Sequence, residues 1–130
     1  MAAALLAHNL AGQNVAAKIE SAGLGALVGN PADPIAQELM AERGIDISNH
    51  RARQLTTEML TEFELILTME SDQVKAIETM HPQSRGRVHR LGKWSDFEVP
   101  DPYRRPRSAF EKSLELIEQG LKEWQQKLWN

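Results

Sequence analysis

The stretch from Asp101 to Arg107 holds the residues of this chain that are best suited to chemistry. It reads Asp-Pro-Tyr-Arg-Arg-Pro-Arg, so a carboxylic acid precedes an aromatic ring and three arginines. Pro102 restricts the backbone of Asp101, and a carboxyl group held in place can protonate a leaving oxygen as a general acid. Nearby arginines would attract a phosphate dianion. Because Asp-Pro is also a common turn signal, an ordinary turn with solvated arginines is the simpler interpretation.

Two more stretches could take part in a site, and each has a structural alternative. Residues 20–29 read as a strand end that runs into a glycine-rich loop, and ligands of open α/β sheets bind at the carboxyl ends of strands. The alternative is an ordinary flexible connection. His50 stands beside Arg51, Arg53 and Gln54, where it could bind an anion or hold a neighbouring loop, but a lone histidine more often satisfies backbone groups.

The composition excludes several classes of function. The 130 residues contain no cysteine, which rules out disulfides, thiolate metal sites and a cysteine nucleophile among them. The four histidines have no metal-ligand spacing, so we expect no metal and no cofactor. The net charge of −3 argues against nucleic acid as a partner, and no apolar run approaches the ~20 residues that span a bilayer. We expect one domain over residues 1–130, no membrane contact and, by default, a cytoplasmic location.

The hydrophobic periodicity predicts alternating strands and helices, and hence an α/β fold with right-handed crossovers. We expect strands at 15–21, 64–69 and 87–91, and the middle one reads as buried on both faces of a parallel sheet. We expect helices at 1–11, from Pro34 to Gly44 with Asp33 as cap, from Thr56 or Thr57 to Leu60, after Ser71 as cap, and at 108–128. The first of these helices has no capping residue before it, as if the domain began within an element.

Taken in order, these stretches resemble the low-molecular-weight protein tyrosine phosphatases, particularly the bacterial members paired with tyrosine kinases of exopolysaccharide export. The resembling pieces cover nearly the whole chain. They are Glu20-Ser21-Ala22-Gly23, Val28-Gly29 with Ala32-Asp33-Pro34, His50-Arg51-Ala52-Arg53-Gln54, Glu64-Leu65-Ile66-Leu67-Thr68-Met69-Glu70 and Asp101-Pro102-Tyr103-Arg104. No piece is decisive by itself, but their joint order and spacing are specific.

The resemblance implies a role for four residues of a substrate cleft. Asp101 matches the general acid that protonates the tyrosyl leaving oxygen. Tyr103 matches an aromatic wall of the cleft, and Leu27 matches the opposing wall, which carries a tryptophan in many eukaryotic members. Arg104 falls at a substrate-binding position where some members have a second tyrosine, so their substrate preference does not transfer directly.

The front of the chain departs from the family pattern. The family implies a three-layer α/β/α fold with a parallel four-stranded sheet of order 2-1-3-4, whose central first strand leads into a Cys-x5-Arg phosphate loop. Residues 1–8 resemble the helix that follows this loop, so the strand and the loop are missing from this chain. Ser21 and His50 match residues that support the loop by hydrogen bonds. We therefore expect a gap in the sheet between residues 16–21 and 64–69, or re-paired strands, and a poorly stable domain.

Two hypotheses for function remain open. The first is an N-terminally truncated protein tyrosine phosphatase whose family partners are phosphotyrosine proteins, such as a bacterial tyrosine kinase, and which is inactive as written because it lacks the nucleophile. The alternative is a non-catalytic module that binds a phosphoprotein or a kinase tail. Coding sequence just upstream for Cys-x5-Arg-Ser-Pro would favour truncation. Arsenate reductases share the fold but also need cysteines. The sequence leaves the oligomeric state open.

Overall fold

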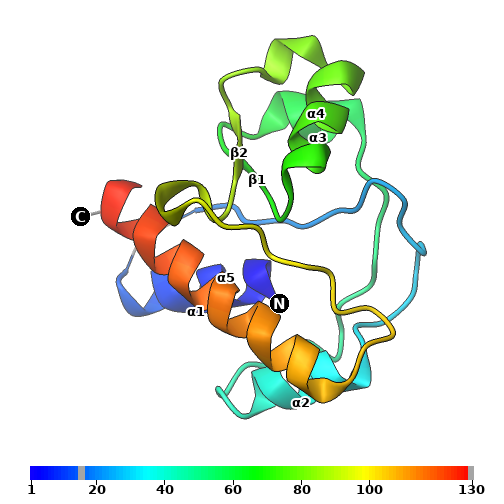
Figure 1. The fold of residues 1–130 in the computed structure, drawn as a ribbon, viewed down its shortest axis with the longest axis vertical. Coiled ribbons are helices and arrows are strands. Elements are labelled where there is room, and N and C mark those ends of the chain that lie inside the picture. Colours follow the sequence, from blue (N-terminus) through cyan, green and yellow to red (C-terminus); the bar gives the residue numbers. More distant parts are fainter. Residues whose placement is uncertain (15–16, 129–130) are drawn as a thin grey trace.

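A computed structural model of the chain describes residues 1–14 and 17–128. Helices lie on both sides of a small parallel sheet (Figure 1). The elements are α1 (Ala2–Gly12), α2 (Pro34–Ala41), α3 (Thr57–Glu62), β1 (Ile66–Thr68), α4 (Ser71–Met80), β2 (Val88–Arg90) and α5 (Arg107–Leu128), with short 3-10 turns at Pro82–Ser84 and Lys93–Ser95. No helix in these described ranges is long and apolar enough to span a membrane.

The two strands pair in parallel, with Ile66 opposite Val88. Successive side chains of a strand point to opposite faces, and β1 uses both faces. Leu67 packs against a large hydrophobic cluster, whereas Ile66 packs against a small one formed by Leu60, Ile77 and Val88. The expectation that this strand contributes to cores on both faces of the sheet is confirmed.

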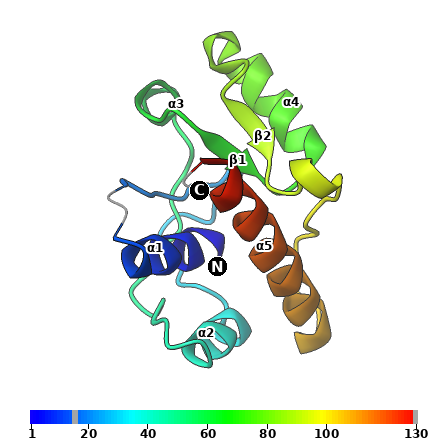
Figure 2. The same ribbon diagram turned by 90° about the vertical axis from the view of Figure 1, so that its left-hand side faces the viewer.

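The helices form a layer on each face of the sheet. In Figure 2, β1 and β2 lie between α3 with α4 on one side and α1 with α5 on the other. The large cluster joins α1, α2 and α5, and its buried members include Leu5, Met40, Leu114 and Trp124. Its centre is the apolar face of α5, whose residues recur every three or four positions as expected. The three-layer α/β/α arrangement is therefore confirmed.

The expected strand at 15–21 is wrong where the structure describes it. Val15 and Ala16 lie outside the described residues, and Ala17–Ser21 belongs to no strand. A strand needs a neighbouring backbone to pair with, and no backbone hydrogen bond among the described residues joins residues 17–21 to residues 65–69. The described sheet thus has two strands rather than four.

Local signals explain most helix boundaries. Asp33 caps α2 by accepting a hydrogen bond from the Ile35 amide at 2.8 Å, as expected. The expected cap of α4 is wrong. Glu70, which is extended, caps this helix in a reciprocal capping box with Gln73. Ser71 is already helical, and its hydroxyl instead donates to Glu98 at 2.6 Å.

Candidate active site

An open cleft of about 550 Å³ is lined by Gly25, Leu27, Asp101, Tyr103 and Arg104. Four of these five residues were expected at a site from the sequence. They come from two loops that are far apart in the chain and that run along the same side of the molecule, at the right of Figure 1. The fold therefore brings the expected acid and the two expected walls to one place.

The loop that carries Asp101 is anchored just before this residue. The amide of Val99, which is buried, donates to the carbonyl of Met69 at 2.9 Å, next to the carboxyl end of β1. The hydroxyl of Ser113, which is 1% exposed on α5, donates to the carbonyl of Pro100 at 2.8 Å. Two neighbouring backbone positions are thus attached to the sheet and to α5, and Asp101 follows directly.

Asp101 itself lies in a turn that leaves part of its carboxylate available. Its Oδ1 accepts a hydrogen bond from the amide of Tyr103 at 3.0 Å, which is an Asx turn. The carbonyl of Pro102 then accepts from the amide of Arg105 at 2.8 Å. The Asp101 side chain is exposed and lines the cleft. The turn interpretation and the site interpretation of this stretch are therefore compatible.

The opposite wall is carried by the glycine-rich loop, which Gln54 holds in place. The side chain of Gln54 accepts from the amide of Ala26 at 3.0 Å and donates to the carbonyl of Leu24 at 2.6 Å. Gly23 pairs with Gln54 through a parallel bridge. The stretch from His50 to Gln54 was expected to bind an anion or to hold a neighbouring loop, and Gln54 holds this loop with a side chain that both donates and accepts. The result presents Leu27 with 56% of its surface exposed.

Ser21 and His50 are not brought into the cleft. Both side chains are exposed, and no hydrogen bond among the described residues joins them. The carbonyl of Ser21 accepts from the Arg53 guanidinium at 2.9 Å. Desolvation by the surrounding protein lowers the pKa of His50, and neighbouring cations that include Arg51 and Arg53 lower it further.

Acidic groups surround the entry of the Asp101 loop. Burial raises the pKa of Glu70, and the negative charges of Asp72, Glu98 and Asp101 raise it further. Glu98 behaves in the opposite way, because hydrogen bonds from Ser71 lower its pKa. Within residues 1–14 and 17–128, no cluster of acidic or histidine side chains is arranged to hold a metal ion.

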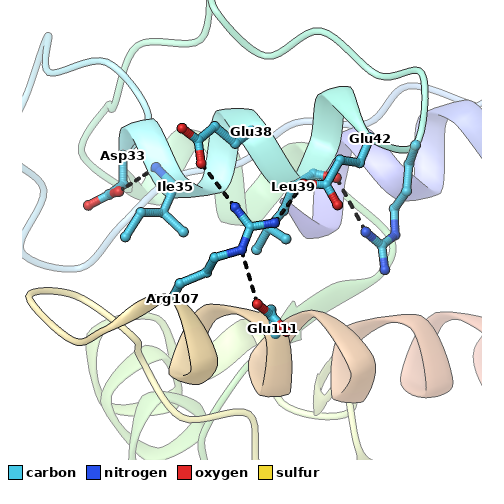
Figure 3. A network of polar contacts seen from close by, with 8 residues as sticks. Asp33, Ile35, Glu38, Leu39, Glu42, Arg107 and Glu111 are labelled. Atoms are coloured by element: carbon cyan, nitrogen blue, oxygen red, sulfur yellow. Dashed lines mark hydrogen bonds and ion pairs between the residues drawn. The ribbon is translucent and has the colours of Figure 1, made fainter.

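Arg107 holds the far end of the same loop to α2 (Figure 3). Its guanidinium forms ion pairs with Glu38 at 3.0 Å, with Glu42 at 2.6 Å and with Glu111 at 3.0 Å. Because Arg107 is the first residue of α5, these contacts set where the loop ends. The loop of the candidate acid is thus attached at both ends.

A family model described as low molecular weight phosphotyrosine protein phosphatase matches residues 1–130. The chain belongs to this family. It is 48% identical over 124 residues to the probable low molecular weight protein-tyrosine-phosphatase EpsP of Ralstonia nicotianae (strain ATCC BAA-1114 / GMI1000), covering 95% of this chain and 83% of that protein. It is 42% identical over 112 residues to the low molecular weight protein-tyrosine-phosphatase Wzb of Escherichia coli (strain K12), covering 85% of this chain and 76% of that protein.

Solved structures of the family share the fold. Wzb of Vibrio vulnificus in complex with benzylphosphonate superposes with a TM-score of 0.89 at 32% identity, over 98% of this chain and 88% of that chain. Wzb of Escherichia coli K30 in complex with sulphate gives a TM-score of 0.89 at 34% identity, over 98% of this chain and 87% of that chain. The expected family and its α/β fold are thereby confirmed.

Proposed function

We propose that this chain serves the hydrolysis of phosphotyrosine in proteins, for which it supplies the general acid and the walls of the substrate cleft. The observation that carries this proposal is the meeting of Asp101, Tyr103 and Leu27 in one cleft. An exposed aliphatic wall and an exposed aromatic wall suit a flat aryl ring. A carboxyl group beside them suits protonation of the oxygen that leaves with this ring.

The family chemistry assigns a step to Asp101. In the mechanism that the resemblance implies, a cysteine thiolate attacks phosphorus, a sulfur–phosphorus bond forms, and the bond from phosphorus to the tyrosyl oxygen breaks. Asp101 gives its proton to that oxygen. Water then attacks the cysteinyl phosphate and passes a proton to Asp101, so that inorganic phosphate leaves and the thiolate returns. Amides and an arginine of the phosphate loop stabilise the transferring group.

The ligands in the related structures support an aryl phosphate as the substrate class. Benzylphosphonate, bound to Wzb of Vibrio vulnificus, combines a phenyl ring with a phosphonate that cannot lose its ring by hydrolysis. Sulphate, bound to Wzb of Escherichia coli K30, is a tetrahedral oxyanion like phosphate. For this chain we propose that the ring lies between Leu27 and Tyr103, and that Ser21 and His50 would support the phosphate loop in a protein that carries one.

The partner in this proposal is a phosphotyrosine protein. The family resemblance favours a bacterial tyrosine kinase of exopolysaccharide export as that partner, and a cytoplasmic location for the encounter. The related EpsP and Wzb proteins carry the name protein-tyrosine-phosphatase, which supports the chemistry.

Residues 1–130 contain no cysteine, so we expect this chain to be inactive as written. Purified chain should release no nitrophenol from p-nitrophenyl phosphate above buffer. A second protein is made for comparison by adding a strand and a Cys-x5-Arg-Ser-Pro loop ahead of Met1. This loop-bearing protein should hydrolyse the same substrate. In that protein, Asp101→Ala should lower the rate by about 10²–10⁴-fold, the usual contribution of general acid catalysis.

Each of the two activity predictions would be contradicted by one specific result. Turnover by the 130-residue chain that survives further purification and disappears in Asp101→Asn would point to a mechanism without cysteine. In the loop-bearing protein, a loss below about threefold in Asp101→Ala, far short of the usual contribution, would mean that Asp101 is not the acid.

A non-catalytic phosphoprotein-binding or kinase-binding module is the second candidate. The absence of a cysteine from the residues that line the cleft, and from all 130 residues, favours this candidate. Under this alternative, the chain binds a phosphotyrosine protein without turnover, and the loop-bearing protein stays inactive. The assay above therefore separates the two functions.

A further inference from the structure

Arg104 has a backbone conformation that its side chain does not favour. Its φ is +61°, in the left-handed region where a Cβ atom crowds the following carbonyl oxygen. Glycine or asparagine usually fills such a turn position. A strained residue persists where the surrounding structure enforces it, and such residues cluster at binding and catalytic sites. Here the strain is combined with a long cationic side chain on the wall of the cleft.

The charge of Arg104 has no carboxylate partner among the described residues, whereas four of the other arginines have one. Arg107, three positions along, contacts three glutamates. Arg43 pairs with Glu118 and Arg53 pairs with Glu20. Arg104 instead lies over the Tyr103 ring, with its guanidinium carbon 5.2 Å from the ring centre. The side chain is thus oriented by an aromatic contact that does not neutralise its charge.

Among the described residues, no hydrogen bond or ion pair uses the side-chain donors of Arg104, whose guanidinium lies over the Tyr103 ring. A guanidinium contacts an aromatic ring through its flat face, whereas its N–H groups point outward in its plane. These groups match the two oxygens of a carboxylate. Within the cleft, Asp101 would repel such a carboxylate, so the Arg104 side is the favourable one. Arg104 therefore offers an oriented anion-binding group beside the place proposed for the aryl ring.

We propose that Arg104 selects phosphotyrosine sites that carry an aspartate or glutamate next to the phosphotyrosine. This inference rests on the proposed function, because it takes the phosphotyrosine ring to lie between Leu27 and Tyr103. The flanking carboxylate then reaches the guanidinium that stacks on Tyr103. Arg104 acts as a specificity residue, and it takes no part in bond breaking.

Four short peptides test this inference on the 130-residue chain. Two carry phosphotyrosine flanked on both sides by glutamate or by glutamine, and two are their unphosphorylated forms. Binding is followed by NMR through the amide signals of Tyr103 and Arg104, up to millimolar peptide and at low salt. The glutamate phosphopeptide should bind about threefold more tightly than the glutamine one, as expected for one exposed ion pair.

Variants of the loop assign the effect to one side chain. Arg104→Gln should abolish the preference for glutamate, and Arg104→Lys should retain part of it, because lysine keeps the charge without the planar fork. Arg105→Gln removes the same charge from the next, exposed position and should leave the preference intact. All of these positions are exposed, and circular dichroism checks that each variant keeps its fold.

The outcomes separate the inference from the proposed function. The inference would be overturned by equal affinity for the two phosphopeptides, or by amide signals that do not shift at millimolar peptide. It would also be overturned if Arg105→Gln lost the preference for glutamate as fully as Arg104→Gln does. The proposed function is tested separately in the loop-bearing protein with its cysteine changed to serine, where equal binding of phosphorylated and unphosphorylated peptides would count against it. The role of Arg104 is decided by the ratio of glutamate to glutamine peptides alone.

Discussion

At the scale of residues, the side chain of the candidate acid Asp101 both stabilises its own turn and lines the cleft. One oxygen of Asp101 closes a turn with the Tyr103 amide, and the same side chain lines the cleft. The family resemblance predicted that Asp101 and Tyr103 line one cleft, and both do, whereas the acid role of Asp101 stays a prediction. Ser113 could also have been suspected, because it is a polar residue on the otherwise apolar face of α5. Glu98 carried no such signal, since its partner Ser71 is distant in the sequence.

Glu98 should make the stability of the chain depend on pH. The amide and hydroxyl of Ser71 donate to its carboxylate and lower its pKa in the folded state. Its stabilising contribution is therefore complete above the unfolded glutamate pKa of about 4.3, and it is lost as the pH falls through the lower folded pKa. Glu98→Gln should lower the thermal midpoint at pH 7, and the difference from the parent chain should shrink toward pH 3.

Glu64→Gln is the matched control, because Glu64 is exposed and forms no ion pair among the described residues. Midpoints are measured by far-UV circular dichroism at pH 7, 5 and 3. If Glu98→Gln lowers the midpoint equally at every pH, the carboxylate charge is not what stabilises this contact.

At the scale of elements, the loop of Asp101 owes its position to β1 before it and α5 after it. Val99 is attached to the end of β1, and Arg107 attaches the start of α5 to α2. The long apolar periodicity of α5 predicted this helix well. The strands were harder, because a run of apolar residues does not show which backbone lies beside it. Residues 64–69 thus read as a longer strand than Ile66–Thr68.

Ser113 should be the residue of α5 whose hydroxyl matters most for this loop. Ser113→Ala removes the hydroxyl that donates to the carbonyl of Pro100, and the net contribution of one such hydrogen bond is about 0.5–1.5 kcal/mol. Ser108→Ala makes the same chemical change at an exposed position of the same helix, where surface substitutions usually stay within about 0.5 kcal/mol. Urea unfolding followed by tryptophan fluorescence measures both, since Trp124 lies in the same cluster as α5. Equal effects of the two substitutions would show that the anchor contributes nothing.

At the scale of the whole molecule, the sheet is small and the core is divided. Two strands form the described sheet, and a two-stranded sheet is marginal without further support. The large cluster lies on one face of it and a cluster centred on Leu60, Ile77 and Val88 lies on the other. Leu65 and Leu67 are half-buried.

We expect the 130-residue chain to be poorly stable and to unfold without a single sharp transition. Near-UV circular dichroism reports its three tryptophans, including Trp124 in the large cluster, whereas far-UV circular dichroism reports all helices. The two transitions should not coincide, because the small cluster should loosen first. A sharp, coincident transition above about 50 °C in a monomer, normal for an intact mesophilic domain, would contradict this expectation.

The sequence by itself determined the family, the helices and the identity of four cleft residues, because these depend on local order, periodicity and residue type. Only the tertiary structure decided which segments pair. Residues 17–21 have the composition of a strand, yet they form none, since a strand exists only with a hydrogen-bonded neighbour. The contacts of Gln54 with the loop of Leu24 and Ala26, and of Glu98 with Ser71, join distant segments, and such contacts leave no local pattern. The place of Arg104 on the wall of the cleft, over the Tyr103 ring and without a carboxylate partner among the described residues, became visible only in the folded chain.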